Sequence, residues 1–555
     1  MRFYKKILCF LLAAVLLLAA PGAVLALEGE DAPGAESLVQ AADEPVDEEE
    51  PAEEPMQPAA QDAPAAKMQA QPLVSIGGGG FTLAPAEDLR MYPIVRVSGA
   101  MNDLIVHEGT DDYEVVGSKD IINVVLEEVL AVAGKMMLSL SMFNYEKATE
   151  PIVKYLWDNL GPIRMNEDGD SYNPDVTIST GWYALWQDEN GHRIFNDDWR
   201  VDPWDSAALL KKVIDDSGFE KVNLMGASGN GNTVLAYLKR YGTHKLASVF
   251  FNFSLHEGSS IYGGLATRQL GPDPLALGNM SILKMNEIYI EPDPVEWIFR
   301  ALYETGFIHL VQKLYSFNYD KMKQKLYDEA MTPLFFMMPH IWSYVPLDQY
   351  EEAKQLLLKG DPKYDKLVER IDRYHYEVMA KAGEILRDAA KEIKVAVRAS
   401  YNNALYGYAL GTGVHGDEKV DTRYASFGAT CAPLNYTFPS SYRQKVPSEY
   451  DYISPDRVVD ASTCAIPEVT WFGNDQPHRG SGEYEGWYEW FLGAEEDYTV
   501  HGNPEYPQYL KHLGHDVYIP LVAAPRPAIF EYLNVAALWM MKAWRFLLLL
   551  PLFWV

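Results

Sequence analysis

The stretch Val222–Asn232, VNLMGASGNGN, carries the strongest structural signal in the chain. A short apolar run leads into a glycine cluster around one serine, Ser228, and a helical pattern follows. Two interpretations are open: a loose surface turn, or a sharp strand–turn–helix bend that presents a hydroxyl as a nucleophile. Small residues beside such a serine let strand and helix pass closely. Three glycines meet that need: Gly226, Gly229 and Gly231. Asn230 stands where the G-x-S-x-G pattern of these bends has glycine.

Short apolar strands alternate with amphipathic helices on both sides of this stretch. The predicted strands are Ile94–Val97, Val222–Met225, Leu246–Phe253, Val395–Asn402 and Glu468–Phe472. One predicted helix begins after an N-cap at Asp205 and stops at Gly218, and the helix after Ser228 ends at Gly242. This alternation predicts an α/β fold: a mostly parallel sheet flanked by helices.

The composition changes several times along the chain. Residues 1–26 have a basic start, an apolar run and small residues at a cleavage position, which predicts a secretory signal peptide; an uncleaved anchor is the alternative. Residues 27–88 are rich in acid, proline and alanine and predict a disordered spacer. The core is then expected in two halves, 89–258 and 395–534.

Between those halves, residues 259–394 are rich in Met, Tyr, Phe and Leu at helical spacing. They predict an inserted helical cap or lid, or an ordinary helical domain with its own core. The hydrophobic segment 535–555 is interrupted by Lys542 and Arg545, which are costly inside a bilayer. Membrane association and a packed terminal helix both remain open for it.

The chain has 555 residues, 48% of them hydrophobic, and a formal net charge of −31. That acidity argues against binding a phosphate backbone, so no nucleic acid partner is expected. Beyond the predicted signal peptide only Cys431 and Cys464 remain, and in an exported protein they either form a disulfide or stay free thiols.

A serine nucleophile needs a base, and the base needs an acid that orients it. In α/β-hydrolases the chain order is Ser, Asp or Glu, then His. The segment after Val395–Asn402 offers three acids, Asp417, Glu418 and Asp421, with Asp460 as a rival. The loop after Glu468–Phe472 offers His478 as the base, with His512 and His515 as rivals.

The oxyanion hole is expected to use two backbone N–H groups. One belongs to Gly229, the residue after the nucleophile. The other belongs to Ala100 or Met101 in the turn after the first strand, and Ala100 is the preferred candidate. A plain connecting loop is the alternative for that turn.

With these residues placed, the chain resembles the lecithin:cholesterol acyltransferase-like branch of the α/β-hydrolases, among secreted bacterial lipase and esterase relatives. Four stretches carry the resemblance: YPIVRVSGAMND (92–103), FNDDWRVDPWDSAALLKKVID (195–215), VNLMGASGNGNTVLAYLKRYG (222–242) and GDEKVDTRYAS (416–426). It covers about residues 92–253 and 395–478. The family's acid loop, with its aspartate three residues before Val420, selects Asp417.

The resemblance implies an exported serine hydrolase that cleaves or transfers acyl groups of lipid-like esters, with no metal or organic cofactor. A lipid-like ester substrate and contact with a lipid interface or membrane are the expected partners. One alternative is a non-catalytic surface protein that keeps the fold as a binding platform, motivated by Asn230 and the uncertain histidine. Another is an amide or thioester hydrolase acting on cell-envelope material.

Overall fold

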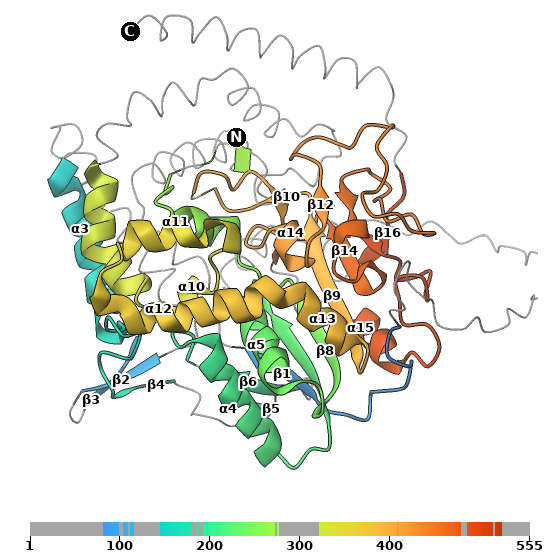
Figure 1. Ribbon diagram of the computed structural model, residues 1–555, viewed down its shortest axis with the longest axis horizontal. Helices are drawn as coiled ribbons and strands as arrows, with labels where there is room; N and C mark the ends of the chain where they lie inside the picture. The colour runs from blue at the N-terminus through green and yellow to red at the C-terminus, as the bar shows by residue number, and fades with distance from the viewer. Residues whose placement is uncertain are drawn as a thin grey trace, which may run out of the picture.

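The computed structural model describes residues 82–98, 104–108, 111–115, 145–178, 186–187, 192–196, 198–271, 273, 275–276, 321–407, 409–478, 485–513 and 517–523. Within these residues, nine strands form one sheet in the order β16-β15-β14-β9-β8-β7-β1-β6-β5 (Figure 1). In chain order they are β1 (Ile94–Ser98), β5 (Trp186–Gln187), β6 (Arg193–Asn196), β7 (Val222–Ala227), β8 (Leu246–Asn252), β9 (Lys394–Tyr401), β14 (Thr470–Asn474), β15 (Tyr509–His512) and β16 (Tyr518–Pro520). Neighbours pair in parallel except at the two edges, where β5–β6 and β15–β16 are antiparallel. The predicted mostly parallel sheet flanked by helices is therefore confirmed.

The central strands are apolar because both faces of the sheet are covered. Every residue of β8, β9 and β14 is buried. The five predicted strands coincide with β1, β7, β8, β9 and β14, with ends shifted by one or two residues. The described residues also form two sheets of two strands each: β10 (Asn403–Ala404) with β11 (His415–Gly416), and β12 (Thr430–Cys431) with β13 (Val459–Asp460). A further sheet has three strands, in the order β3 (Asp111–Val115), β2 (Leu104–Glu108) and β4 (Val176–Ile178).

Helices α4 (Pro203–Asp216) and α5 (Gly231–Tyr241) lie on the side of the sheet that faces the viewer in Figure 1. The predicted N-cap at Asp205 is wrong. Asp202 caps α4, because its carboxylate accepts the N–H of Trp204 at 2.8 Å and Pro203 occupies the first helical position. Asp205 lies within the first turn instead. At the end of α5 the predicted stop is confirmed: Gly242 takes φ 66° and ψ −153°, a conformation that glycine adopts readily and residues with a Cβ do not.

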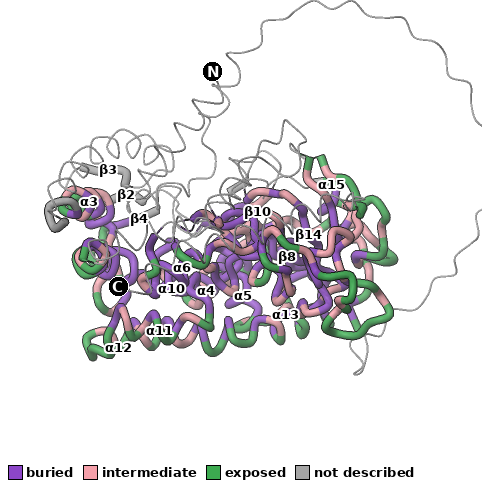
Figure 2. The backbone as a smooth tube through the Cα atoms, turned by 90° about the horizontal axis from the view of Figure 1, so that it is seen from above, coloured by how far each residue is buried: buried purple, intermediate pink, exposed green. Residues whose placement is uncertain are grey.

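The regular elements described between β8 and β9 are all helical. They include α6 (Ser260–Ala266), the wide turns Tyr327–Phe335 and Arg373–Val378, α10 (Pro339–Trp342), α11 (Leu347–Leu357), α12 (Asp365–Asp372) and α13 (Ala382–Ala390). Together with α3 (Tyr145–Leu160), most of them share one apolar cluster that includes five buried methionines. α13 instead joins the cluster of the sheet with α4, α5 and α15 (Glu485–Gly493). Figure 2 shows the exposed positions of α11 and α12 at the rim, and mostly buried positions at α5 and β8.

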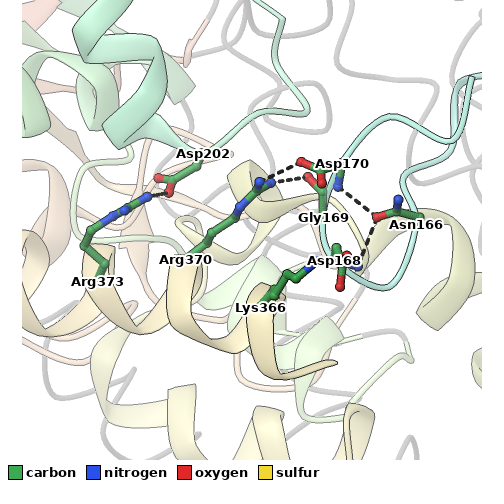
Figure 3. A network of polar contacts seen from close by, with 8 residues as sticks. All are labelled: Asn166, Asp168, Gly169, Asp170, Asp202, Lys366, Arg370 and Arg373. Carbon is green, nitrogen blue, oxygen red and sulfur yellow. Dashed lines mark hydrogen bonds and ion pairs between the residues drawn. The ribbon is translucent and has the colours of Figure 1, made fainter. Parts of the chain in front are cut away.

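Basic side chains along α12 and the turn after it tie this helical region to the rest of the chain (Figure 3). Arg373 pairs with Asp202, Arg370 binds Asp170 and the carbonyl of Gly169, and Lys366 pairs with Asp168. The Asp202 carboxylate is 1% exposed, and burial raises its pKa above the ordinary value. The guanidinium of Arg373 supplies the compensating charge for the residue that caps α4.

Several predictions fall on the ends of the chain. The signal peptide 1–26, most of the spacer 27–88 and the segment 535–555 lie outside the described residues. Within the last residues assigned to the spacer, Leu83 and Ala84 are buried, and the Ala84 N–H donates to the carbonyl of Ala390 at 2.7 Å. None of the helices in the described part of the chain combines the length and apolar composition needed to cross a bilayer. Cys431 and Cys464 are both free thiols.

Candidate active site

Ser228 sits at the tip of a strand–turn–helix bend between β7 and α5. Its φ of 51° places a non-glycine residue in the left-handed region, which costs on the order of 1–3 kcal/mol and persists only where surrounding structure enforces it. The N–H of Leu255, in the loop after β8, donates to the Ser228 carbonyl at 2.8 Å and helps to hold that conformation. Ser228 is half-buried, whereas Gly229 beside it is buried. The bend is therefore strained, anchored and open enough to present its hydroxyl.

Two glycines allow the close crossing of strand and helix. A methyl group on Gly226 would lie 2.8 Å from a Val234 side-chain carbon and 3.0 Å from the Cα of Gly231. A methyl group on Gly231 would lie only 1.5 Å from Ser254 Oγ. Asn230 has φ −90° and ψ −4°, an ordinary helical conformation, so this position needs no glycine. The small residue that such a bend requires stands one place later, at Gly231.

His478 and Asp417 complete a hydrogen-bond chain to this serine. His478 Nε2 lies 2.9 Å from Ser228 Oγ, and His478 Nδ1 lies 2.8 Å from Asp417 Oδ2. An ionised carboxylate only accepts hydrogen bonds, so Nδ1 carries the proton and Nε2 offers its lone pair to the serine hydroxyl. The histidine and aspartate side chains are 2% and 1% exposed. The structure therefore brings the three candidates together in the order that the sequence predicts.

Asp417 is oriented by its own loop. Its Oδ1 accepts the N–H groups of Lys419 and Val420 at 2.9 and 2.7 Å, which leaves Oδ2 directed at the imidazole. The backbone carbonyl of Asp417 also accepts the N–H of His478 at 2.7 Å. Acid and base are thus joined through both backbone and side chain, although 61 positions separate them.

The loops of the site leave the carboxyl ends of neighbouring parallel strands, where sites of open α/β sheets form. Ser228 follows β7, Asp417 lies in the chain after β9, and His478 follows β14. The base loop is fixed to the end of β9, because the Asp475 N–H donates to the Tyr401 carbonyl at 3.1 Å. The acid loop is fixed to α6, because the buried Asp421 carboxylate accepts the backbone N–H and the hydroxyl of Ser260.

The rival acids and bases have other roles or lie outside the described residues. Asp421 binds Ser260, and burial raises its pKa to about 6. Asp460 accepts from the Tyr442 hydroxyl and from the N–H groups of Lys445 and Ser462, so it braces a loop. The ring of His512 packs against Tyr518 at 5.1 Å. Glu418 is buried with φ 86° beside the acid that the histidine contacts, and His515 is outside the described residues.

Two further histidines lie near the bend, and neither belongs to a sequence motif that would single it out. His256 is fully buried, stacks on Phe427 at 3.7 Å and has Nδ1 3.0 Å from Ser254 Oγ; burial lowers its pKa to about 3. His340 has Nδ1 3.0 Å from the Val201 carbonyl and Nε2 3.4 Å from the Gly229 carbonyl. Both rings support the backbone around the bend. No local motif marks them, because Phe427, on which His256 stacks, and the carbonyls next to the His340 ring come from distant parts of the chain.

Of the predicted oxyanion donors, only Gly229 lies within the described residues. Gly229, whose N–H follows the nucleophile, is buried at the start of the turn that leads into α5. Ala100 and Met101 lie outside the described residues. Within the described part of the chain, no group of three or more His, Cys, Asp or Glu side chains is arranged to hold a metal ion.

Comparison with known proteins adds little to this geometry. No family model matches the chain, and no curated protein matches its sequence. Among solved structures, the one described as "The crystal structure of Tle4-Tli4 complex" contains a chain that is similar over 60% of this chain and 89% of its own length. The sequence identity is 13% and the TM-score 0.25, a likeness too weak to carry an inference about activity.

Proposed function

We propose that this protein is an exported serine hydrolase with an α/β-hydrolase fold that cleaves, or transfers, acyl groups of lipid-like carboxylic esters. The observation that carries the proposal is the hydrogen-bond chain from Ser228 Oγ through both ring nitrogens of His478 to Asp417. The strained backbone of the serine supports it, because such strain is characteristic of an exposed nucleophile at a strand–helix bend.

The residues would act in a fixed order. As Ser228 Oγ forms a bond to the ester carbonyl carbon, its proton moves to His478 Nε2. The carbonyl oxygen becomes an oxyanion, which the Gly229 N–H would stabilise, with Ala100 as the second backbone donor. The tetrahedral intermediate collapses, the ester C–O bond breaks, and His478 returns the proton to the departing alkoxide. Water, or an alcohol in a transferase, then attacks the acyl-enzyme by the same route. Asp417 holds the imidazole and stabilises its charged form.

Two parts of this proposal, the lipid-like substrate class and the export of the protein, go beyond the hydrogen-bond chain and need their own support. The resemblance of four sequence stretches to the acyltransferase-like branch supports the substrate class, and the composition of residues 1–26 supports export. The apolar region between β8 and β9 supports a cap over an acyl-binding site. The buried, oriented imidazole argues against the non-catalytic alternative, because a binding platform has no need of a base held against a serine.

A fluorophosphonate probe tests the proposal directly, since it reacts only with an activated serine. We expect the folded protein to gain one phosphonyl adduct on the peptide containing Ser228, and to cleave p-nitrophenyl esters. Ser228→Ala should lose both activities, while Ser217→Ala, at the end of α4, should keep them. An unlabelled folded protein, or unchanged labelling of Ser228→Ala, would overturn the proposal. If the protein cleaves matched amides or thioesters faster than esters, its substrates are amides or thioesters rather than lipid-like esters.

A further inference from the structure

The hydroxyl of Tyr344 lies directly against Gly229, the residue whose N–H is the predicted oxyanion donor. A methyl group on Gly229 would lie 2.2 Å from Tyr344 Oη and 2.9 Å from its Cζ. Gly229 does not adopt a positive φ, so its backbone does not require glycine. The phenol occupies the space that a side chain would need, and this explains why glycine follows the serine.

Contacts from several elements fix the position of this phenol. The Tyr344 side chain is buried, and its ring packs against the rings of Tyr262 and His340, with centroids 4.7 and 5.3 Å away. The Tyr344 carbonyl accepts the N–H of Ser259 at 2.9 Å.

The residue before Tyr344 fixes the same segment to the first turn of α5. The Asn232 amide donates to the Ser343 carbonyl at 3.2 Å and to the Ser343 hydroxyl. The Ser343 hydroxyl in turn donates to the His340 carbonyl at 2.6 Å. The phenol is therefore held in place before any substrate binds, as electrostatic stabilisation of a transition state requires.

We propose that the Tyr344 hydroxyl donates a hydrogen bond to the oxyanion of the tetrahedral intermediate, together with the N–H of Gly229. An oxyanion hole binds that oxygen about 2.7–3.1 Å from its donors. Tyr344 Oη lies 2.2 Å from the position of a Cβ on Gly229, which brings the hydroxyl close to the volume in front of the amide nitrogen bonded to the same Cα. A phenol is neutral and protonated at neutral pH, so it can donate without proton transfer. This role rests on the proposed function, because it assigns a catalytic residue to the same reaction.

Tyr344→Phe tests the role, because it removes the hydroxyl and keeps the ring. We expect kcat for a p-nitrophenyl ester to fall about 10–100-fold with little change in KM, and the rate of fluorophosphonate labelling to fall in parallel. Tyr374→Phe is the matched control. It removes a buried phenol hydroxyl whose acceptor is the His256 carbonyl, at 3.0 Å. A loss of fivefold or more for Tyr344→Phe, greater than that of the control, supports the role, and any smaller loss overturns it.

A second variant tests the geometry independently of the chemistry. Gly229→Ala places a methyl group against the phenol, and we expect its melting temperature to fall by roughly 5 °C or more. Adding Tyr344→Ala should restore part of that loss without restoring kcat. If Gly229→Ala is as stable and active as wild type, the phenol does not occupy this space and the inference fails.

The two levels of the proposal fail in different ways. An unlabelled wild type refutes the serine hydrolase itself. A wild type labelled on Ser228, with Tyr344→Phe labelled at the same rate, refutes only the role of Tyr344.

Discussion

The bend at Ser228 and the loops that carry Asp417 and His478 are positioned by different means. The bend is local: a strand, a turn and a helix lie within residues 222–241, and glycines at 226 and 231 allow their close crossing. The loops depend on contacts between distant segments, such as the Asp475 N–H with the Tyr401 carbonyl and Asp421 with Ser260. Local geometry leaves a pattern in the sequence, whereas long-range contacts leave only candidates.

The largest expected effect tests whether the acid loop does more than pack. Asp417→Asn keeps the shape of the side chain. Its oxygen would still accept the N–H groups of Lys419 and Val420, so its NH₂ group would donate to His478 Nδ1 and favour the wrong tautomer. We expect kcat to fall about 10³–10⁴-fold. Asp460→Asn, at the rival acid, should leave kcat within threefold and cost about 1 kcal/mol of unfolding free energy. An Asp417→Asn enzyme within tenfold of wild type would show that this loop is only structural.

Because the bend leaves no room for a side chain at Gly231, a substitution there should lower the free energy of unfolding. Gly231→Ala forces a methyl group against Ser254 Oγ, and we expect a loss of about 3 kcal/mol in denaturant unfolding. Gly242→Ala is the control. A Cβ at this position would meet no atom of a non-neighbouring residue within 4 Å, so only the backbone, with its φ of 66°, would be strained. The substitution should cost about 1 kcal/mol. If both substitutions lower the free energy of unfolding equally, the close packing at Gly231 does not determine the shape of the bend.

This contrast explains which parts were predictable. The strands, the bend and the end of α5 follow from apolar runs and glycines that are contiguous in the chain, so their positions were predicted within one or two residues. His478 had rivals because its partners lie far away in the chain. Tyr344 and His340 come from the apolar region between β8 and β9, where the helical pattern gives no sign of which rings face the serine. The cap of α4 was misplaced because Asp202 and Asp205 lie only three positions apart and aspartate favours this position; Pro203, which follows Asp202, is what marks the true start of the helix.

The contact between the acid loop and α6 should be sensitive to pH. Burial raises the pKa of Asp421 from its ordinary value near 4 to about 6, so between these pH values the native state keeps a proton that the unfolded chain releases. The stability from this group is present below about pH 4 and is lost as pH rises through 6. Asp421→Asn stays neutral, so the unfolding free energy of wild type minus that of the variant should fall by about 2 kcal/mol from pH 4 to 6.5. A difference that is constant over this range would contradict the buried, protonated carboxyl.

The smallest expected effect concerns the ion pairs that α12 and the turn after it form with the rest of the chain. Arg373→Met leaves the buried Asp202 without its cation, and we expect a loss of about 2 kcal/mol in unfolding free energy. Lys366→Met removes a pair whose lysine side chain is 69% exposed, and its cost should stay below about 0.5 kcal/mol. Similar costs in denaturant titrations would show that burial does not distinguish the two pairs.

The most direct test of the central claim is whether the two differently positioned parts act as one unit. We would measure kcat on a p-nitrophenyl ester for Ser228→Ala, for His478→Ala and for the double variant. Residues of one catalytic unit are not additive, so each single change should lower kcat by about 10⁴-fold or more and the double variant should be no slower. Multiplying effects, or a Ser228→Ala enzyme that keeps most of its rate, would contradict a serine nucleophile activated by this histidine.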